Sequence, residues 1–506
     1  MHELHDHIKR VVRQTVALTI MIVVTPVTGY CQAAPPLHIN WNKIVSESRS
    51  TATFQVVVNP MLRKGSPIYE PSFDAIRRLN AEYVRYGAWY PYPRLSVAEL
   101  EPPGKDSTHW DFRLLDEVLF DFLEASKGHT SILNFCTIPQ WMFRTPGRVP
   151  YPADPNEIDF GYKGGNELCD TTLKELGDYY ARFFRWYTQG GFTDELGRYH
   201  PSGHDIQIPW WEVLNEPELE HGTTPEQYTR RYDAIVHAIK EVSPDTRFIG
   251  MASVAYGNPD FFEYFLDPAN HRPGTPIDMI SYHFYAGAHP GLEFGDYHYA
   301  YFDKADAFLN CVRYIERIRQ RLAPETGTAI NELGTFLSEE MRGLPIPDKY
   351  WNLSGAVYAY LYMELSKMGI EIIGQSQLVG YPGQFPDVSM MNWENGRPNA
   401  RYRVLQLLVN QFAPGDTLVE TITGFMNPSD YVAQAFKTRS GKKVLLVNKY
   451  DHTLRVKIPA ALEGARLSVV DVATGDKPPV ESVISSGYLE LKPYAVAVAV
   501  LKGESP

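Results

Sequence analysis

Residues 208–242 read IPWWEVLNEPELEHGTTPEQYTRRYDAIVHAIKEV and contain one strand followed by one helix. Residues 208–214 form a short, mostly apolar run, which is typical of a strand buried in a sheet. Pro217 ends that run and fixes the turn that follows it. Residues 225–242 carry apolar side chains every three to four positions and predict an amphipathic helix. The stretch is therefore one strand–helix unit.

The same unit recurs on both sides of this stretch, between about residues 50 and 411. Eight strands alternating with eight helices predict a parallel sheet that closes into a (β/α)8 TIM barrel over residues 35–412. An open, doubly wound sheet is the competing fold, but the chain lacks its Gly-rich phosphate turn. The expected strands are 53–58, 83–86, 130–136, 208–214, 247–251, 279–284, 328–332 and 370–375, and the expected helices are 72–80, 113–126, 172–188, 225–242, 259–266, 304–321, 351–368 and 400–410.

The pattern changes after residue 412, where short strand-like runs follow one another without helices. Turns such as Ser440-Gly441 and Thr474-Gly475 separate them. Residues 413–506 are therefore expected to form a C-terminal antiparallel β-sandwich with an accessory role. Residues 37–44, which precede the barrel, are expected to add a strand to this C-terminal sandwich. The expected strands are 431–437, 443–448, 453–458, 466–472, 488–491 and 495–501.

The N-terminal 34 residues have the features of a secretory signal peptide. Positive charges at Lys9, Arg10 and Arg13 precede an apolar run over residues 16–24, and small residues follow at Ala33 and Ala34. We therefore expect a secreted or periplasmic protein with no membrane span after signal removal; an uncleaved anchor is the alternative, although the run is short for a bilayer.

Composition excludes several classes of function. The net charge is −12 and no long basic run occurs, which argues against a nucleic-acid partner. The 15 histidines lack the spacing of a metal site, so neither metal nor cofactor is expected. The chain has no Gly-x-Ser-x-Gly elbow, which argues against a serine esterase. Removal of the signal leaves Cys136, Cys169 and Cys311, of which one pair could form a disulfide that the sequence does not identify.

Two glutamates stand at the ends of predicted strands. Glu216 follows the fourth strand in WWEVLNEP (210–217), and Glu332 ends the seventh in AINELG (329–334). The loops at this end of a barrel build the active site, so both carboxyl groups are expected at its mouth. Hydrolysis of a glycosidic bond requires such a pair, and a separation of about 5 Å gives a covalent intermediate and retention. A neighbouring carboxylate and an apolar wall would keep Glu216 protonated while Glu332 is ionised.

These segments resemble the clan A retaining glycoside hydrolases. The run from Trp211 to Gly250 is most similar to family 39, which contains β-xylosidases and α-L-iduronidases. The resemblance implies an O-glycosyl hydrolase acting on an oligosaccharide, a polysaccharide or a glycoside, for example a β-xyloside. It implies that Glu216 is the acid/base and Glu332 the nucleophile. The other residues it implies, all substrate-binding or supporting, are Asn215, His283, Tyr285, Arg85, Trp393 and Trp89.

Asn215 would hold the sugar 2-hydroxyl, Tyr285 would bond the nucleophile, and His283 would contact the substrate or the acid. Arg85 would keep Glu332 ionised, and Trp393 would lie under the reacting sugar. Two segments depart from the family pattern: residues 83–90 lack its usual His-Gly, and residues 375–393 are long and rich in Pro and Gly. Both line the sugar pocket in the clan, which leaves the choice of sugar, the linkage and exo or endo action open.

Other interpretations compete with catalysis. Glu212 lies on the same side of its strand as Glu216 and is expected to be an interior partner of Arg85. Trp141 is as well explained by core packing as by stacking on a sugar, and Cys136 is expected to be a buried packing residue. At the level of the whole chain, the alternatives are a catalytically silent carbohydrate-binding barrel and a transglycosidase with the same two glutamates.

Overall fold

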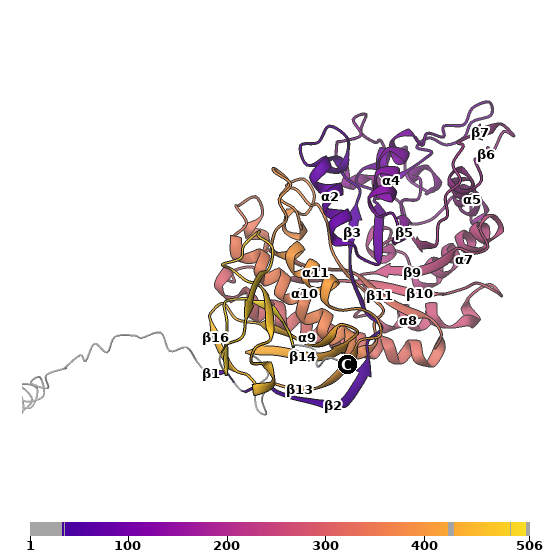
Figure 1. Ribbon diagram of the computed structural model, residues 1–506. Coiled ribbons are helices and arrows are strands. Elements are labelled where there is room, and N and C mark those ends of the chain that lie inside the picture. Colours follow the sequence, from indigo (N-terminus) through magenta and orange to yellow (C-terminus); the bar gives the residue numbers. More distant parts are fainter. Residues whose placement is uncertain (1–32, 35, 424–429, 486, 502–506) are drawn as a thin grey trace, which may run out of the picture. The chain divides into compact units, whose positions relative to one another are not determined.

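The computed structural model describes residues 33–34, 36–423, 430–485 and 487–501, and its central feature is a closed barrel of eight parallel strands (Figure 1). Each barrel strand pairs with the next one along the chain, and the last pairs with the first. The (β/α)8 fold predicted from the sequence is confirmed. The barrel strands are β3 (Thr51–Val57), β4 (Tyr83–Ala88), β5 (Thr130–Phe135), β8 (Trp210–Val213), β9 (Arg247–Ser253), β10 (Met279–Gly287), β11 (Gly327–Phe336) and β12 (Ile372–Gln375).

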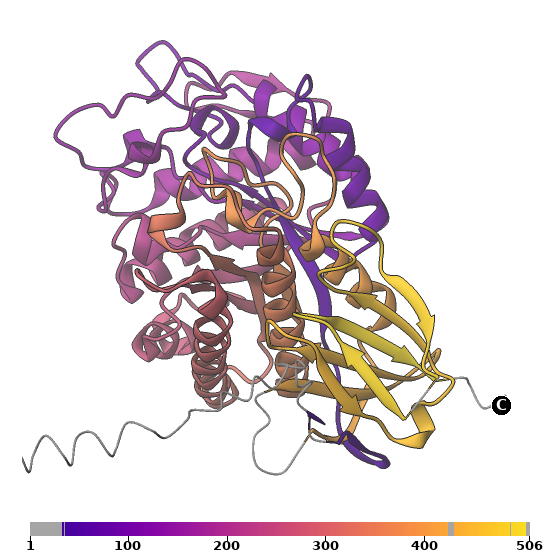
Figure 2. The same cartoon turned by 90° about the vertical axis from the view of Figure 1, so that its left-hand side faces the viewer.

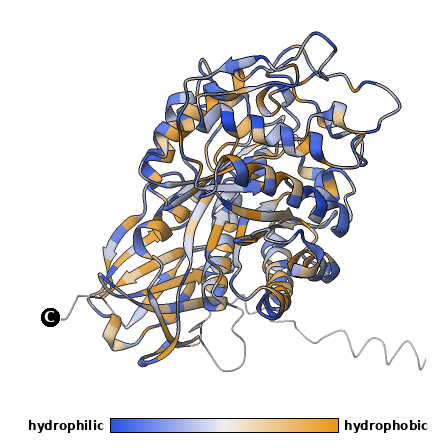
Figure 3. Cartoon of the chain, turned by 90° about the vertical axis from the view of Figure 1, so that its right-hand side faces the viewer, coloured by the Kyte–Doolittle hydropathy of each residue, from blue (hydrophilic) through white to orange (hydrophobic). Residues whose placement is uncertain are grey.

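One main helix follows each barrel strand. Helix α7 shows why such a helix begins where it does: Thr224 and Gln227 form a capping box, and Pro225 occupies the first turn. Along α4, the buried apolar residues recur every three or four positions and belong to the apolar core. Figure 3 shows that apolar and polar residues alternate along the helices of the molecule. The eight helices are α2 (Tyr69–Leu79), α4 (Arg113–Ala125), α5 (Lys174–Thr188), α7 (Pro225–Val242), α8 (Pro259–Leu266), α9 (Tyr297–Leu322), α10 (Asp348–Met368) and α11 (Ala400–Gln411).

The C-terminal domain consists of a seven-stranded and a three-stranded sheet. The larger sheet has the order β18-β17-β20-β15-β14-β13-β2, and the smaller has the order β1-β16-β19. An apolar core contributed by both sheets fills the domain. The strands are β1 (Ala33–Ala34), β2 (His38–Glu47), β13 (Thr417–Ile422), β14 (Tyr431–Thr438), β15 (Gly441–Asn448), β16 (Leu454–Lys457), β17 (Arg466–Val470), β18 (Val480–Val483), β19 (Tyr488–Leu491) and β20 (Val496–Val500).

Strand β2 comes from the start of the chain and pairs antiparallel with β13, with Ile39 opposite Thr421. The expectation that residues 37–44 add a strand to the C-terminal domain is therefore confirmed. By their pairing, residues 38–47 belong to that sheet, and the barrel itself runs from Thr51 to Gln411.

Helix α10 is buried on almost every side, because it lies between the barrel and the C-terminal sheet (Figure 2). Apolar residues of that sheet, among them Phe436 and Leu445, belong to the same continuous core as the barrel helices. The sheet thus shields an apolar helix that would otherwise face water, which gives the domain a structural role.

Apart from Ala33 and Ala34, the expected signal segment lies outside the described residues. Within the described ranges, no helix has the length and apolar character needed to cross a membrane. Cys136, Cys169 and Cys311 are all free, so the disulfide that the sequence left open does not form among them.

Candidate active site

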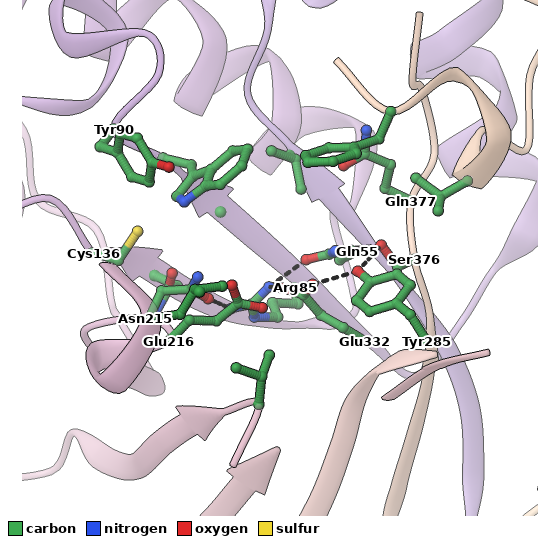
Figure 4. A pocket seen from close by; sticks show the side chains of 18 of the residues that line it. Gln55, Arg85, Tyr90, Cys136, Asn215, Glu216, Tyr285, Glu332, Ser376 and Gln377 are labelled. Carbon is green, nitrogen blue, oxygen red and sulfur yellow. Dashed lines mark hydrogen bonds and ion pairs between the residues drawn. The ribbon is translucent and has the colours of Figure 1, made fainter. Parts of the chain in front are cut away.

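A cavity of about 420 Å³ opens at the carboxyl ends of the barrel strands. All eight strands, or the residues directly after them, contribute to its lining. Polar groups gather on its floor, where Asn215 and Glu216 lie on one side of Arg85 and Tyr285 and Ser376 lie on the other (Figure 4). This is the end of a TIM barrel at which active sites form.

Glu216 enters the cavity from a turn of unusual backbone conformation. Strand β8 ends at Val213, and Leu214 and Glu216 then adopt left-handed conformations with φ of 64° and 37°. The Glu216 N–H donates a 2.9 Å hydrogen bond to the carbonyl of Ala252, and Pro217 begins the short helix α6 (Pro217–Glu220). Left-handed non-glycine residues are costly and concentrate at functional sites.

Glu332 lies on β11, where two neighbours hold its two oxygens. Arg85 Nη1 donates to Oε1 at 2.6 Å, and the Tyr285 hydroxyl donates to Oε2 at 2.6 Å. The Tyr285 hydroxyl is also 2.7 Å from Ser376 Oγ. The carboxylate is therefore fixed in position by one charged and one neutral donor.

His283 lies between the two glutamates. Its Nδ1 is 2.8 Å from Glu216 Oε1, and its Nε2 is 3.5 Å from Glu332 Oε1. One carboxyl oxygen of Glu216, one of Glu332 and one nitrogen of His283 all lie within 4.8 Å of one another. The two carboxyl groups predicted from the sequence are thus brought together at the same end of the barrel.

The surroundings drive the pKa values of the two carboxyl groups apart. Burial raises the pKa of Glu216, helped by the negative charge of Glu332, although the hydrogen bond from His283 opposes the rise. Burial would also raise the pKa of Glu332, but the charges of His283 and Arg85 and the Tyr285 hydrogen bond outweigh it and lower that pKa. Such a split pair contains one proton donor and one ionised carboxylate.

These three side chains, Glu216, His283 and Glu332, also form a group of candidate metal ligands within the described part of the chain. Their hydrogen bonds favour another arrangement. Nδ1 of His283 is bonded to Glu216, and the positive guanidinium of Arg85 already neutralises Glu332 at 2.6 Å. A cation placed among them would have to compete with both interactions.

Arg85 is buried and connects the floor of the cavity to the barrel interior. It forms ion pairs with Glu212 as well as Glu332, and its Nη2 donates to Asn215 Oδ1 at 3.0 Å. Glu212 also accepts hydrogen bonds of 2.6 Å from Ser281 and Asn331. The prediction that Glu212 is an interior partner of Arg85 is confirmed.

Aromatic side chains form the upper wall of the cavity. Trp89, one of the residues predicted from the sequence, is 6.0 Å from Phe385 and 6.1 Å from Phe160 between ring centroids. The ring of Phe336 also packs near that of Phe385, with 5.7 Å between the centroids. Phe336 ends strand β11, and the other three rings lie in segments that follow β4, β5 and β12. Their mutual contacts join them into one apolar wall of the cavity.

Trp393, which the resemblance places under the reacting sugar, does not line this cavity. The segment after β12 folds back on itself, because Met390 N–H bonds to the carbonyl of Gln377 and Asn392 N–H to that of Arg397. Trp393 consequently lines a separate cavity of about 550 Å³ that Trp351 also lines. Trp141 donates to the carbonyl of Glu99 and packs against the core, so packing explains it.

Sequence reasoning missed several residues of the cavity. Gln55 pairs in register with Arg85 on the adjacent strand, so its place at the end of a barrel strand was a signal that could have found it. Ser376, Lys163 and Phe385 lie in loops whose paths the pattern does not reveal. Glu220, at the end of α6, bonds both Asn215 and Trp89 but has no motif of its own.

Comparisons with known proteins find one family match in the C-terminal domain and several solved structures with a similar fold. Residues 428–499 match the family described as D-apionate lactonase, C-terminal immunoglobulin-like domain. The chain is similar in structure to a GH51 arabinofuranosidase from Xanthomonas axonopodis pv. citri (TM-score 0.61, 12% identity, covering 93% of this chain and 100% of that one).

It is also similar to an alpha-L-arabinofuranosidase from Thermotoga maritima (TM-score 0.59, 14% identity, 92% of this chain and 99% of that one) and to a GH30 endoxylanase from Clostridium papyrosolvens C71 (TM-score 0.55, 11% identity, 92% and 100%). At this level of identity, the likeness shows a shared fold. A search of curated proteins found no match.

Proposed function

We propose that the protein is a retaining glycoside hydrolase in which Glu332 is the nucleophile and Glu216 the general acid/base. The observation that carries the proposal is the spacing of their carboxyl oxygens, which lie within 4.8 Å of each other in one cavity. Retaining glycosidases hold their carboxyl groups about 5–5.5 Å apart, whereas inverting enzymes need a wider gap for water.

In the first step, a carboxylate oxygen of Glu332 attacks the anomeric carbon and the bond to the leaving oxygen breaks. Glu216 gives its proton to that oxygen, so the leaving group departs as an alcohol. In the second step, Glu216 takes a proton from a water molecule whose oxygen attacks the same carbon. The ester bond to Glu332 then breaks and the sugar leaves with its original configuration.

The electrostatics of the site fit both steps. Before the attack, the charge of Glu332 helps to keep Glu216 protonated, because it raises the pKa of Glu216. Once Glu332 is esterified, that charge is gone and the pKa of Glu216 falls, which prepares it to act as a base. Arg85 and Tyr285 orient the nucleophile.

For the substrate, we propose a terminal sugar of a β-linked plant or microbial glycan, such as a β-xyloside. Support for exo action comes from the aromatic wall, because rings from four different parts of the barrel meet beside a single cavity of about 420 Å³. Support for a pentose comes from the names of the structural neighbours, which include arabinofuranosidases and an endoxylanase. The family 39 resemblance of residues 211–250 points the same way, and the signal-like N-terminus supports action outside the cytoplasm.

A panel of aryl glycosides tests this function. Glu332→Ala should abolish turnover, and Glu216→Ala should lose activity most on substrates with poor leaving groups and regain part of it with azide. Glu226→Gln, at an exposed position of α7, is the matched control and should keep the wild-type rate. An unchanged rate in Glu332→Ala would refute the assignment.

The same panel separates the alternatives. A silent carbohydrate-binding barrel would bind sugars without turnover, and a transglycosidase would transfer the sugar to an added acceptor faster than to water. The match of residues 428–499 favours one further candidate, hydrolysis of a sugar lactone. Turnover of an aldonolactone, with no turnover of any aryl glycoside, would select that candidate.

A further inference from the structure

Glu220 is a further buried carboxyl group close to Glu216 and Glu332. It is the last residue of α6, four positions after Glu216, and only 5% of its surface is exposed. Among the described residues it forms no ion pair with an arginine, lysine or histidine. Burial of a carboxyl group without a cationic partner costs free energy, so the hydrogen bonds of Glu220 must offset that cost.

Both side-chain hydrogen bonds of Glu220 go to residues that line the cavity. Oε1 accepts a 2.7 Å hydrogen bond from Trp89 Nε1 and a 2.9 Å hydrogen bond from Asn215 Nδ2. Trp89 belongs to the aromatic wall of the cavity, and Asn215 to its floor beside Glu216. One buried oxygen therefore fixes a residue on each of two sides of the sugar pocket.

The contacts of Asn215 also fix the orientation of its amide. Arg85, which can only donate, bonds the amide oxygen at 3.0 Å, and Glu220 accepts one hydrogen of the amide nitrogen. The nitrogen has a second hydrogen, which no described hydrogen bond uses. Asn215 can offer that hydrogen to a sugar hydroxyl.

We propose that Glu220 is a positioning residue that holds Asn215 and Trp89 so that Asn215 donates to the hydroxyl next to the reacting carbon. This inference rests on the proposed function. Arg85 bonds both Asn215 and Glu332, which places the amide beside the nucleophile. In glycosidases, a hydrogen bond to the 2-hydroxyl strengthens in the transition state, so the position of its donor affects kcat more than KM.

The protonation of Glu220 agrees with this role. Burial raises the pKa of Glu220 well above its ordinary value, and the nearby charge of Glu216 adds to the rise, although the two hydrogen bonds oppose it. A carboxyl group that keeps its proton adds no negative charge to that of Glu332, while its other oxygen still accepts both hydrogen bonds. Glutamine has the same shape and a carbonyl acceptor, so it should replace Glu220 well.

Kinetics with paired substrates test the proposal. Aryl glycosides with and without the 2-hydroxyl are assayed with wild type, Glu220→Gln and Glu220→Leu. On the 2-hydroxyl substrate, Glu220→Leu should lower kcat about 10- to 100-fold, and Glu220→Gln should stay within about threefold of wild type. On the 2-deoxy substrate, Glu220→Leu should cost less than about threefold, because the contact it supports is absent.

Glu218→Gln is the matched control on the same helix. Glu218 accepts hydrogen bonds from the backbone of Val254 and Ala255, so any loss in this variant should be equal for the two substrates. An equal loss on both substrates in Glu220→Leu would overturn the positioning role and leave only a structural one. Glu220→Ala serves the same purpose if the leucine prevents folding.

Crystal structures of the variants give a readout that needs no turnover. In Glu220→Leu, the Trp89 indole and the Asn215 amide should leave their wild-type positions, and in Glu220→Gln they should keep them. Unchanged positions in Glu220→Leu would overturn the proposal even if the protein hydrolysed no glycoside. Absence of any glycosidase activity in the wild type, by contrast, would refute the proposed function alone.

Discussion

The hydroxyl of Tyr285 donates a 2.6 Å hydrogen bond to Oε2 of Glu332 across the boundary between strands β10 and β11. This bond lowers the pKa of Glu332. Tyr285→Phe should therefore reduce kcat by about 10- to 100-fold, the effect of losing a hydrogen bond to a charged group. It should also move the acidic limb of the pH–rate profile to higher pH.

Tyr86→Phe is the control for this variant. The Tyr86 hydroxyl is buried among helix-facing rings and has no hydrogen-bond partner among the described residues. Its removal should leave both the rate and the pH profile as in wild type. A Tyr285→Phe enzyme with a wild-type acidic limb would contradict the contribution assigned to this hydrogen bond.

The pH dependence of activity follows from the split pKa values of Glu216 and Glu332. Activity requires ionised Glu332, whose pKa is lowered, so the acidic limb should lie below the usual range of a glutamate. It also requires protonated Glu216, whose pKa is raised, so the alkaline limb should lie above that range. With a dinitrophenyl glycoside, Glu216→Gln should lose the alkaline limb and keep the acidic one, because that leaving group needs no proton.

Breaking the buried pair between Arg85 and Glu212 should destabilise the barrel. Glu212→Gln removes a fully buried charge and leaves part of the Arg85 charge uncompensated. The free energy of unfolding, measured with denaturant, should fall by about 3–5 kcal/mol. Glu124→Gln, which breaks the exposed pair with Lys127, should change it by less than about 1 kcal/mol. Equal effects in the two variants would argue against the interior role.

Two tryptophans should differ in their contribution to substrate binding. Trp89 lines the cavity that contains both glutamates, and Trp393 lines the separate one. Trp89→Ala should raise KM for an aryl glycoside about tenfold, through the loss of an aromatic contact surface. Trp393→Ala should leave both kcat and KM for the same substrate unchanged. A raised KM in Trp393→Ala would mean that the loop after β12 adopts another path with substrate bound.

The fold could be predicted because hydrophobic periodicity is local. Each barrel strand is an apolar run and each helix an amphipathic one, so alternation alone indicates the order of the elements. The two glutamates could be predicted for the same reason, because each one lies near the carboxyl end of a strand and these ends meet at the barrel mouth. The interior place of Glu212 followed from alternation along its strand, whereas Arg85 was implied by the family resemblance.

The path of the long loops could not be predicted, because distant hydrogen bonds determine it. The segment that contains Trp393 is turned back by bonds from Asn399 to the carbonyls of Ser389 and Met390. No local pattern encodes such contacts. Glu220 could not be predicted either, since a four-residue helix has too few positions to show a periodic face.

Strand β2, which precedes the barrel in the chain, is the edge of a sheet whose other strands follow the barrel. During synthesis, this strand emerges first but can find its neighbour β13 only after more than 350 intervening residues have been made. The accessory domain therefore cannot be completed until nearly the whole polypeptide has been translated. A chain that ends at residue 412 would expose both β2 and the apolar face of α10, and it should aggregate unless the missing segment is supplied in trans.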